Sequence, residues 1–340
     1  MWLLQVKSLA PTQFLTGLIF LAATLFASAD TAQLSAEQSL RVIAERFFEP
    51  LPESMAGSEK DTPEQIALGR ALYFETELSV NGSQSCNSCH NIETNSQGKS
   101  GNGADEESKS IGATGIPGKR NSPTTWNAGL QTAQFWDARA TTLEEQARSP
   151  LLNPDEMALV SEENALQKLQ GAGYEPIFTK AFPESQSALS FGNLISALAA
   201  FQRTLISKDR FDDYLIGDDN ALSAQEKRGL EKFVRTGCNG CHNGPLLGGT
   251  SIMKLGIAHP YPNGEDTGRA QVTGKRGDRY FFKVPPLRNV GLTAPYFHDG
   301  AETSLKKAVA ATAWHQLGIT MSDEDAADIS AFLRSLNNTL

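Results

Sequence analysis

Apolar residues recur at helical spacing in two segments, and each segment runs toward a short cysteine-rich motif. Thr62 and Ser223 begin these segments as capping residues, each followed three residues later by Gln or Glu. The apolar positions are Ile66, Leu68, Leu72 and Phe74 in the first segment and Leu230, Phe233 and Val234 in the second. The pattern predicts two matching short helices.

Two further segments are typical of helices. One helix start lies at Ser35 to Gln38, and Ser322 to Leu336 carries apolar residues at helical spacing near the C-terminus. Nowhere does a convincing alternation of apolar and polar residues predict a strand. The sequence therefore predicts an all-α fold with long Gly/Pro-rich loops between its helices.

An apolar run from Phe14 to Ala27 precedes all of these elements, with Lys7 as the one charge before it. The small residues Ala27, Ser28 and Ala29 follow, which is typical of a signal peptide over residues 1–29 cleaved before Asp30. A retained anchor helix is the alternative, but the run is shorter than the roughly 20 residues that a bilayer requires. We expect an exported chain with no membrane span after cleavage.

The overall charge excludes some classes of function. The 340 residues carry a formal net charge of -9, and removing the leader with its single Lys makes the chain one unit more negative. Nucleic-acid binding and attachment to an anionic membrane surface both favour a positive surface, so neither is expected. The length is sufficient for about two domains.

All 4 Cys of the chain fall into two copies of the motif C-x-x-C-H. In an exported chain, Cys would ordinarily suggest disulfides, but this spacing is that of c-type haem attachment. The two thiols bond one porphyrin, and the following imidazole binds its iron. A zinc half-site is the alternative, but zinc does not explain a His after each pair. The attachment residues are Cys86, Cys89 and His90 in the first copy and Cys238, Cys241 and His242 in the second.

Two motifs that each follow a short helix suggest a duplication. We expect two cytochrome c-like haem domains related by a pseudo-twofold axis, over residues 30–205 and 206–340. Each covalently bound haem c would supply the apolar centre that long loops cannot provide.

A di-haem protein is either an electron carrier or an enzyme, depending on whether one iron keeps an open position. Only His259, His298 and His315 remain as further imidazole ligands, and no His lies between His90 and His242. The mature methionines are the other candidates: Met55, Met157, Met253 and Met321.

Several longer motifs then resemble the bacterial di-haem cytochrome c peroxidases, a family that includes the methylamine-utilisation protein MauG. The resemblance runs from about Pro63 to Leu336. It is carried by RNSPT from Arg120, FWDARA from Phe135, LEEQA from Leu143 with Pro150, NPDEM from Asn153, KVPPLRNV from Lys283 and LTAPYFHDG from Leu292. Their order along the chain makes the likeness far more specific than the two haem motifs alone.

The resemblance implies roles for particular residues. The haem on His90 would be the one that reduces peroxide, with Gln146 and Glu156 above it and Pro150 shaping the pocket. Glu156 would take a proton from the bound peroxide and return it to the departing oxygen. Trp136 would lie between the two haems and assist electron transfer.

The resemblance also implies partners. The haem on His242 would receive electrons from a small cytochrome c or a cupredoxin in the periplasm, and the acidic chain favours a basic partner. Asn121, Thr293 and Pro295 match positions that bind a calcium ion. Dimers are common in this family, although the sequence shows no diagnostic interface.

Two positions depart from the family. Ala113 stands where many members have a distal His on the peroxide-reducing haem, so we expect an open iron in the oxidised enzyme. Thr312 stands where the second haem has Met, or Tyr in MauG and its relatives. His315 and Met321 are the nearby alternatives as ligands.

Three functions stay open from the sequence. The favoured one is a periplasmic peroxidase that reduces hydrogen peroxide to water. The second is a MauG-like enzyme that oxidises Tyr or Trp of a partner protein, and the third is a non-enzymatic di-haem electron carrier.

Overall fold

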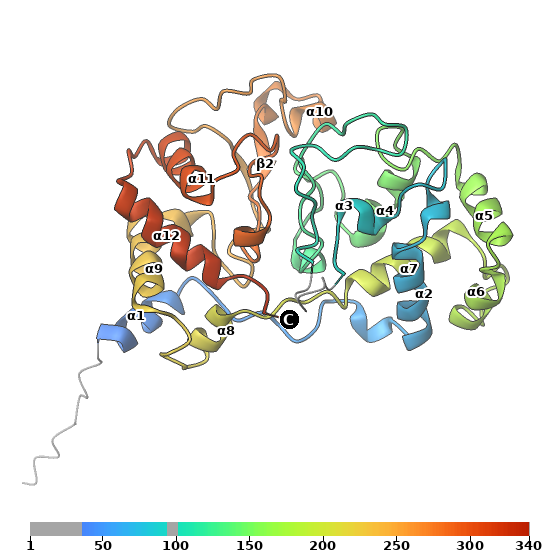
Figure 1. Ribbon diagram of the computed structural model, residues 1–340, viewed down its shortest axis with the longest axis horizontal. Helices are drawn as coiled ribbons and strands as arrows, with labels where there is room; N and C mark the ends of the chain where they lie inside the picture. Colours follow the sequence, from blue (N-terminus) through green and yellow to red (C-terminus); the bar gives the residue numbers. More distant parts are fainter. Residues whose placement is uncertain (1–35, 94–100, 340) are drawn as a thin grey trace, which may run out of the picture. The chain divides into compact units, whose positions relative to one another are not determined.

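Helices dominate the computed structural model, which describes residues 36–93 and 101–339 (Figure 1). The predicted signal peptide lies outside these residues. The α-helices are α1 (Ala36–Ala44), α2 (Pro63–Tyr73), α3 (Cys86–Cys89), α4 (Leu143–Leu152), α5 (Glu162–Gly171), α6 (Glu175–Ala181), α7 (Phe191–Gln202), α8 (Arg210–Leu215), α9 (Ala224–Thr236), α10 (Ala270–Thr273), α11 (Leu305–Thr312) and α12 (Asp323–Ser335).

The four segments with helical patterns all form helices, as α1, α2, α9 and α12. Both predicted capping arrangements are present. Thr62 Oγ1 accepts a hydrogen bond from the Gln65 amide at 3.2 Å, and the Gln65 side chain accepts one from the Thr62 amide at 3.0 Å. Ser223 and Glu226 make the same reciprocal pair at the start of α9. The two caps satisfy amides that a helix N-terminus leaves unpaired.

The prediction of a chain without strands was wrong for two short segments. β1 (Ile252–Lys254) and β2 (Phe281–Lys283) pair in antiparallel register, with Ile252 opposite Lys283. Three residues are too few to show an alternating pattern, so pairing between distant segments creates strands that the sequence does not signal. The fold is otherwise mostly helical.

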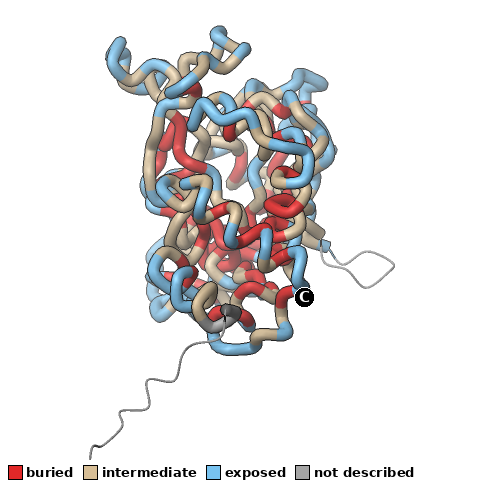
Figure 2. The backbone as a smooth tube through the Cα atoms, turned by 90° about the vertical axis from the view of Figure 1, so that its left-hand side faces the viewer, coloured by how far each residue is buried: buried red, intermediate tan, exposed pale blue. Residues whose placement is uncertain are grey.

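The buried apolar residues gather in two clusters. The first joins α2, α4, α5, α6 and α7, and the second joins α1, α8, α9, α11 and α12. Figure 2 shows this buried interior beneath exposed outer loops. Residues 36–340 form one compact unit, and a boundary near residue 205 stays a prediction. No helix within the described ranges is long and apolar enough to cross a membrane.

One helix pair in each cluster packs through a glycine. A Cβ atom added at Gly69 of α2 would lie 1.8 Å from the Ala197 carbonyl oxygen of α7. A Cβ at Gly229 of α9 would lie 2.0 Å from the Asp328 carbonyl oxygen of α12. Both helix pairs therefore approach so closely that no side chain fits at the crossing point.

Two loop segments, residues 121–140 and 283–302, have the same local backbone in the same order. Each contains a short 3-10 helix, Ala128–Leu130 or Val290–Leu292, and one isolated antiparallel bridge, Gln134 to Ala140 or Tyr296 to Glu302. Left-handed backbone conformations occur at matching positions in Asn127 and Asn289, in Phe135 and Phe297, and in Ala138 and Gly300. The two segments also exchange hydrogen bonds, because the Asn121 amide donates to the His298 carbonyl and the Lys283 amide to the Trp136 carbonyl, each at 2.8 Å.

Candidate functional site

The first C-x-x-C-H motif forms the single helical turn α3, followed by His90. Tyr73 of α2 fixes this turn by donating its hydroxyl to the His90 carbonyl at 2.6 Å. The His90 Nδ1 lies 3.3 Å from the Gly103 carbonyl oxygen, and Cys86 packs against the first apolar cluster. Burial lowers the pKa of His90 and so favours the neutral imidazole that binds metals.

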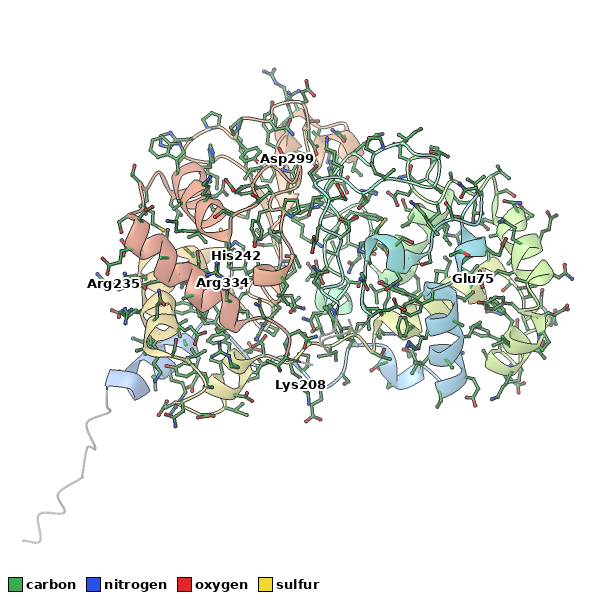
Figure 3. The ribbon with its side chains drawn as sticks, viewed as in Figure 1. Glu75, Lys208, Arg235, His242, Asp299 and Arg334 are labelled. Atoms are coloured by element: carbon green, nitrogen blue, oxygen red, sulfur yellow. The ribbon has the colours of Figure 1, made fainter. Side chains whose placement is uncertain are left out.

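The second motif repeats this arrangement. His242 follows a 3-10 turn, Cys238–Gly240, and its Nδ1 lies 2.9 Å from the Leu247 carbonyl oxygen. Cys238 packs against the second apolar cluster, and His242 lies beside the helices of that cluster (Figure 3). A carbonyl on Nδ1 orients the ring and leaves Nε2 for a metal.

The residues at both motifs fit covalently held haem. Each site pairs an oriented imidazole with two half-buried thiols, and one thiol of each pair, Cys86 or Cys238, packs against an apolar cluster. A closed zinc site needs four ligands, whereas in the described part of the chain no three His, Cys, Asp or Glu side chains are grouped so that they could hold one metal ion.

Glu156 lies close to the first motif. The Asn153 side chain donates to its Oε1 at 2.7 Å, and the Ala113 amide donates to its carbonyl at 2.8 Å. Its carboxylate is near enough to contribute to the raised pKa of the Cys89 thiol, which is caused mainly by burial. The structure therefore brings Glu156, Ala113 and the first motif together.

Gln146 lies on α4, half-buried, in the helix that also contains Pro150 and ends just before Asn153. The Pro150 carbonyl accepts a hydrogen bond from the Met157 amide at 3.1 Å, which ties the loop carrying Glu156 back to this helix. The role of the Gln146 side chain stays a prediction.

Sequence reasoning missed Asp105. Its carboxylate accepts a hydrogen bond from Ser110 Oγ at 2.5 Å, and both residues influence the pKa of the Cys89 thiol. Asp105 is therefore a second carboxylate beside the first motif. In the sequence it begins an acidic run that looks like an ordinary solvated loop, so only the folded arrangement distinguishes it.

Trp136 belongs to the first of the two matching loop segments and also contacts the second. Its indole Nε1 donates to the Asn121 carbonyl at 2.9 Å, and its ring meets the His298 ring edge-on at 6.4 Å between centroids. Arg120 bonds Asp137 at 2.6 Å on one side and Asp266 at 2.7 Å on the other. A charge network thus fixes the loop that carries Trp136.

The three residues expected to bind calcium belong to these same two segments. Asn121 is buried, and its Nδ2 donates to the Glu107 carbonyl at 3.1 Å, which leaves Oδ1 as an acceptor. Its backbone bond to His298 places it alongside the segment that contains Thr293 and Pro295. Proline offers only its carbonyl oxygen, an atom that suits calcium. Calcium binding stays a prediction.

The candidate ligands of the second iron lie around the end of α11. Thr312 is its last residue, and a π-helical turn over Ala313–Leu317 follows. The His315 Nδ1 lies 3.0 Å from the His259 carbonyl oxygen, and Met321 packs against the second apolar cluster. The identity of the ligand stays open.

Residues 63–220 match the family described as Di-haem cytochrome c peroxidase. The chain is 41% identical to cytochrome c551 peroxidase of Pseudomonas aeruginosa, over 89% of this chain and 88% of the relative. It is 34% identical to methylamine utilization protein MauG of Methylorubrum extorquens, over 93% of this chain and 90% of the relative.

A solved structure agrees with these sequence relatives. The crystal structure of a MauG-like protein associated with microbial copper homeostasis has a TM-score of 0.73 and 28% identity, covering 85% of this chain and 94% of that one. The chain is a peroxidase-type oxidoreductase, and it belongs to the di-haem cytochrome c peroxidase family.

Proposed function

We propose that this chain is a periplasmic enzyme that reduces hydrogen peroxide to two molecules of water, using two protons and two electrons from a small cytochrome c or a cupredoxin. The observation that carries the proposal is the position of Glu156 beside Cys89 and Ala113. A carboxylate next to an attachment motif, in a residue that is hydrogen-bonded to one without a metal-binding side chain, supports a site for peroxide.

Haem held by His90 would supply the iron that binds peroxide and the electrons that break its O–O bond. Glu156 would accept one proton of the peroxide and return it to the oxygen that leaves as water. The side-chain amide of Asn153 holds the Glu156 carboxylate in place for both proton transfers. Gln146 donates a hydrogen bond to the bound peroxide.

His242 would hold the haem that receives the electrons, and Trp136 would lie on the path from it to the haem held by His90. The anchoring of Trp136 to both loop segments supports this path, because a fixed aromatic ring needs little reorganisation. The acidic chain supports a donor with a basic surface.

The matching loop segments and the matching helix pairs support a duplication with a pseudo-twofold axis, with domains over residues 30–205 and 206–340. Asn121, Thr293 and Pro295 would then bind calcium where the two copies meet. The predicted leader over residues 1–29 supports export to the periplasm.

A MauG-like oxidation of Tyr or Trp on a partner protein is the second candidate. Ala113 favours it, because an iron without a distal His reacts with peroxide in its oxidised state. The likeness to two kinds of relative, the cytochrome c551 peroxidase and MauG, is consistent with either activity.

The test is peroxide-dependent oxidation of reduced cytochrome c by the holoenzyme and by Glu156→Gln. We expect the substitution to lower kcat by about 10²- to 10⁴-fold, as for loss of a general acid-base group. Glu163→Gln, which changes an exposed carboxylate on α5, is the matched control and should keep wild-type turnover. Full turnover in Glu156→Gln would refute the assignment, and peroxide consumption without cytochrome oxidation would favour the MauG-like function.

A further inference from the structure

Lys283, the last residue of β2, is a buried amine with neutral hydrogen-bond partners. Only 6% of the residue is exposed, and its Nζ donates to Gln131 Oε1 and, at 3.0 Å, to the Ala133 carbonyl. Within residues 36–93 and 101–339, no carboxylate oxygen lies within ion-pair distance of Nζ. Burying a charged group without a paired carboxylate costs free energy. A buried lysine at this position therefore suggests that its charge has a function.

The position of Lys283 relative to the two haem motifs suggests what this function is. Lys283 and Trp136 line one small cavity together with Pro123 and Pro285. The Pro123 carbonyl lies beside the His90 ring, and the Pro285 carbonyl lies beside the His242 ring. Residues that line the cavity therefore contact both of the imidazoles that would hold the irons.

The matching loop segments give a second, independent observation. In their common register, Lys283 corresponds to Asn121, Gln131 to Thr293 and Ala133 to Pro295. The ammonium of Lys283 is bound by oxygen atoms of the two residues that correspond to Thr293 and Pro295. An internal ammonium thus occupies the counterpart of the three-residue cluster expected to bind calcium.

We propose that Lys283 is a positioning residue whose ammonium acts as a built-in cation between the two haem sites and raises the reduction potential of both. This proposal rests on the proposed function only in assuming that both sites hold haem. A fixed positive charge stabilises the added electron on either side of it. It also discourages loss of an electron from the Trp136 ring, so Trp136 stays reduced between turnovers.

The surrounding charges are consistent with this role. Burial lowers the pKa of Lys283 to about 8 and the Asp137 carboxylate opposes that effect, so the ammonium form still predominates at pH 7. Asp137 is itself bound by Arg120 and Arg139, whose two positive charges more than offset its negative charge in the surroundings of Lys283.

The direct test is a spectroelectrochemical titration of the haem-loaded Lys283→Met enzyme, which keeps a side chain of similar length without the charge. Unit charges about 10 Å apart in a medium of effective dielectric about 20 shift an equilibrium about tenfold. We therefore expect both midpoint potentials to fall by about 59 mV, the equivalent of a tenfold change for a one-electron couple. Lys180→Met, which removes an exposed charge on α6, should leave both unchanged. Unchanged potentials in Lys283→Met would overturn the proposal.

A rescue experiment tests the correspondence with Asn121. Lys283→Asn recreates the residue of the matching segment, so added calcium should bind one more ion per chain than in the wild type and restore the potentials. Lys283→Met should not respond to calcium. If Lys283→Asn also fails to respond, the two clusters are not equivalent. The potentials and the calcium binding are measured with bound haem but without turnover. The Lys283 proposal can therefore be wrong while the peroxidase assay succeeds, and it can be right while that assay fails.

Discussion

We expect Ala113 to leave the iron of the first haem without a sixth ligand from the protein. The backbone of Ala113 is fixed by the Glu156 carbonyl and by the Asn81 side chain, which donates to the Ala113 carbonyl at 2.8 Å. A methyl group at this position cannot bind iron, and no other His is available nearby in the sequence.

We predict that one haem gives a high-spin signal in the fully oxidised enzyme. We also predict that this haem reacts with peroxide before either haem is reduced. Electron paramagnetic resonance of the resting protein measures the spin state. Ala113→His should convert that haem to a low-spin form in the same spectrum. A purely low-spin spectrum from the unmodified enzyme would contradict the open position.

Asp266 links the long loop before α10 to Arg120. Burial alone would raise the pKa of Asp266, but the hydrogen bonds from Arg120 and from the Gly268 amide, together with the positive charge of Arg120, outweigh burial and hold the pKa below its ordinary value. A carboxyl whose pKa is lower in the folded state stabilises the fold above the unfolded pKa near 3.8 and loses that contribution as the pH falls through the folded pKa.

Asp266→Asn should therefore lower the free energy of unfolding by about 1 to 3 kcal/mol at pH 7, because the charged hydrogen bond to Arg120 is lost. The difference from wild type should shrink below pH 4. Denaturant unfolding at both pH values measures it. Asp323→Asn, at a side chain that is 96% exposed, serves as the control. A difference that is independent of pH would show that the charge of Asp266 is not what stabilises the loop.

At the scale of elements, the fold depends on two helix pairs, α2 with α7 and α9 with α12, that cross at a glycine. The atoms that a new Cβ would meet are backbone carbonyl oxygens, which cannot move aside as a flexible side chain can. The capping boxes start α2 and α9 at fixed residues, and these helices in turn place the two haem motifs.

Gly69→Ala and Gly229→Ala should each destabilise the folded enzyme by about 1 to 3 kcal/mol through overpacking. Thermal unfolding of the haem-loaded protein measures the loss. Gly192→Ala on α7 is the matched control, since nothing lies within 4 Å of a Cβ there, and it should be neutral or slightly stabilising. Equal stability of all three variants would show that the close crossings are not essential.

Across the whole molecule, the features that can be predicted from the sequence are those that depend on residues close together in the chain. Capping residues and apolar spacing predicted α2 and α9, and the C-x-x-C-H spacing predicted the two attachment sites. The position of Asp105 beside Cys89 and the burial of Lys283 depend on contacts between distant segments. The pattern of residues within one segment does not reveal its contacts with a distant segment. The strands β1 and β2 were not predicted for the same reason.

The charge network around Trp136 likewise could not be predicted from the sequence, because it includes a contact between distant segments. Arg120 and Asp137 belong to motifs visible in the sequence, but Asp266 lies far along the chain and only the fold brings it to Arg120. The resemblance to a family assigns candidate chemical roles to residues such as Glu156, but it does not reveal the residues that hold them in place.

We expect the haem-loaded enzyme to couple peroxide reduction to oxidation of a soluble electron donor. The most direct measurement is the stoichiometry of reduced cytochrome c oxidised per hydrogen peroxide consumed in steady state, with the products analysed for modified protein. We predict two cytochromes oxidised per peroxide, because each cytochrome supplies one of the two electrons, and no new covalent change in Tyr or Trp. Peroxide consumption with no cytochrome oxidised, or with cross-linked or hydroxylated aromatic residues as the main product, would contradict the account.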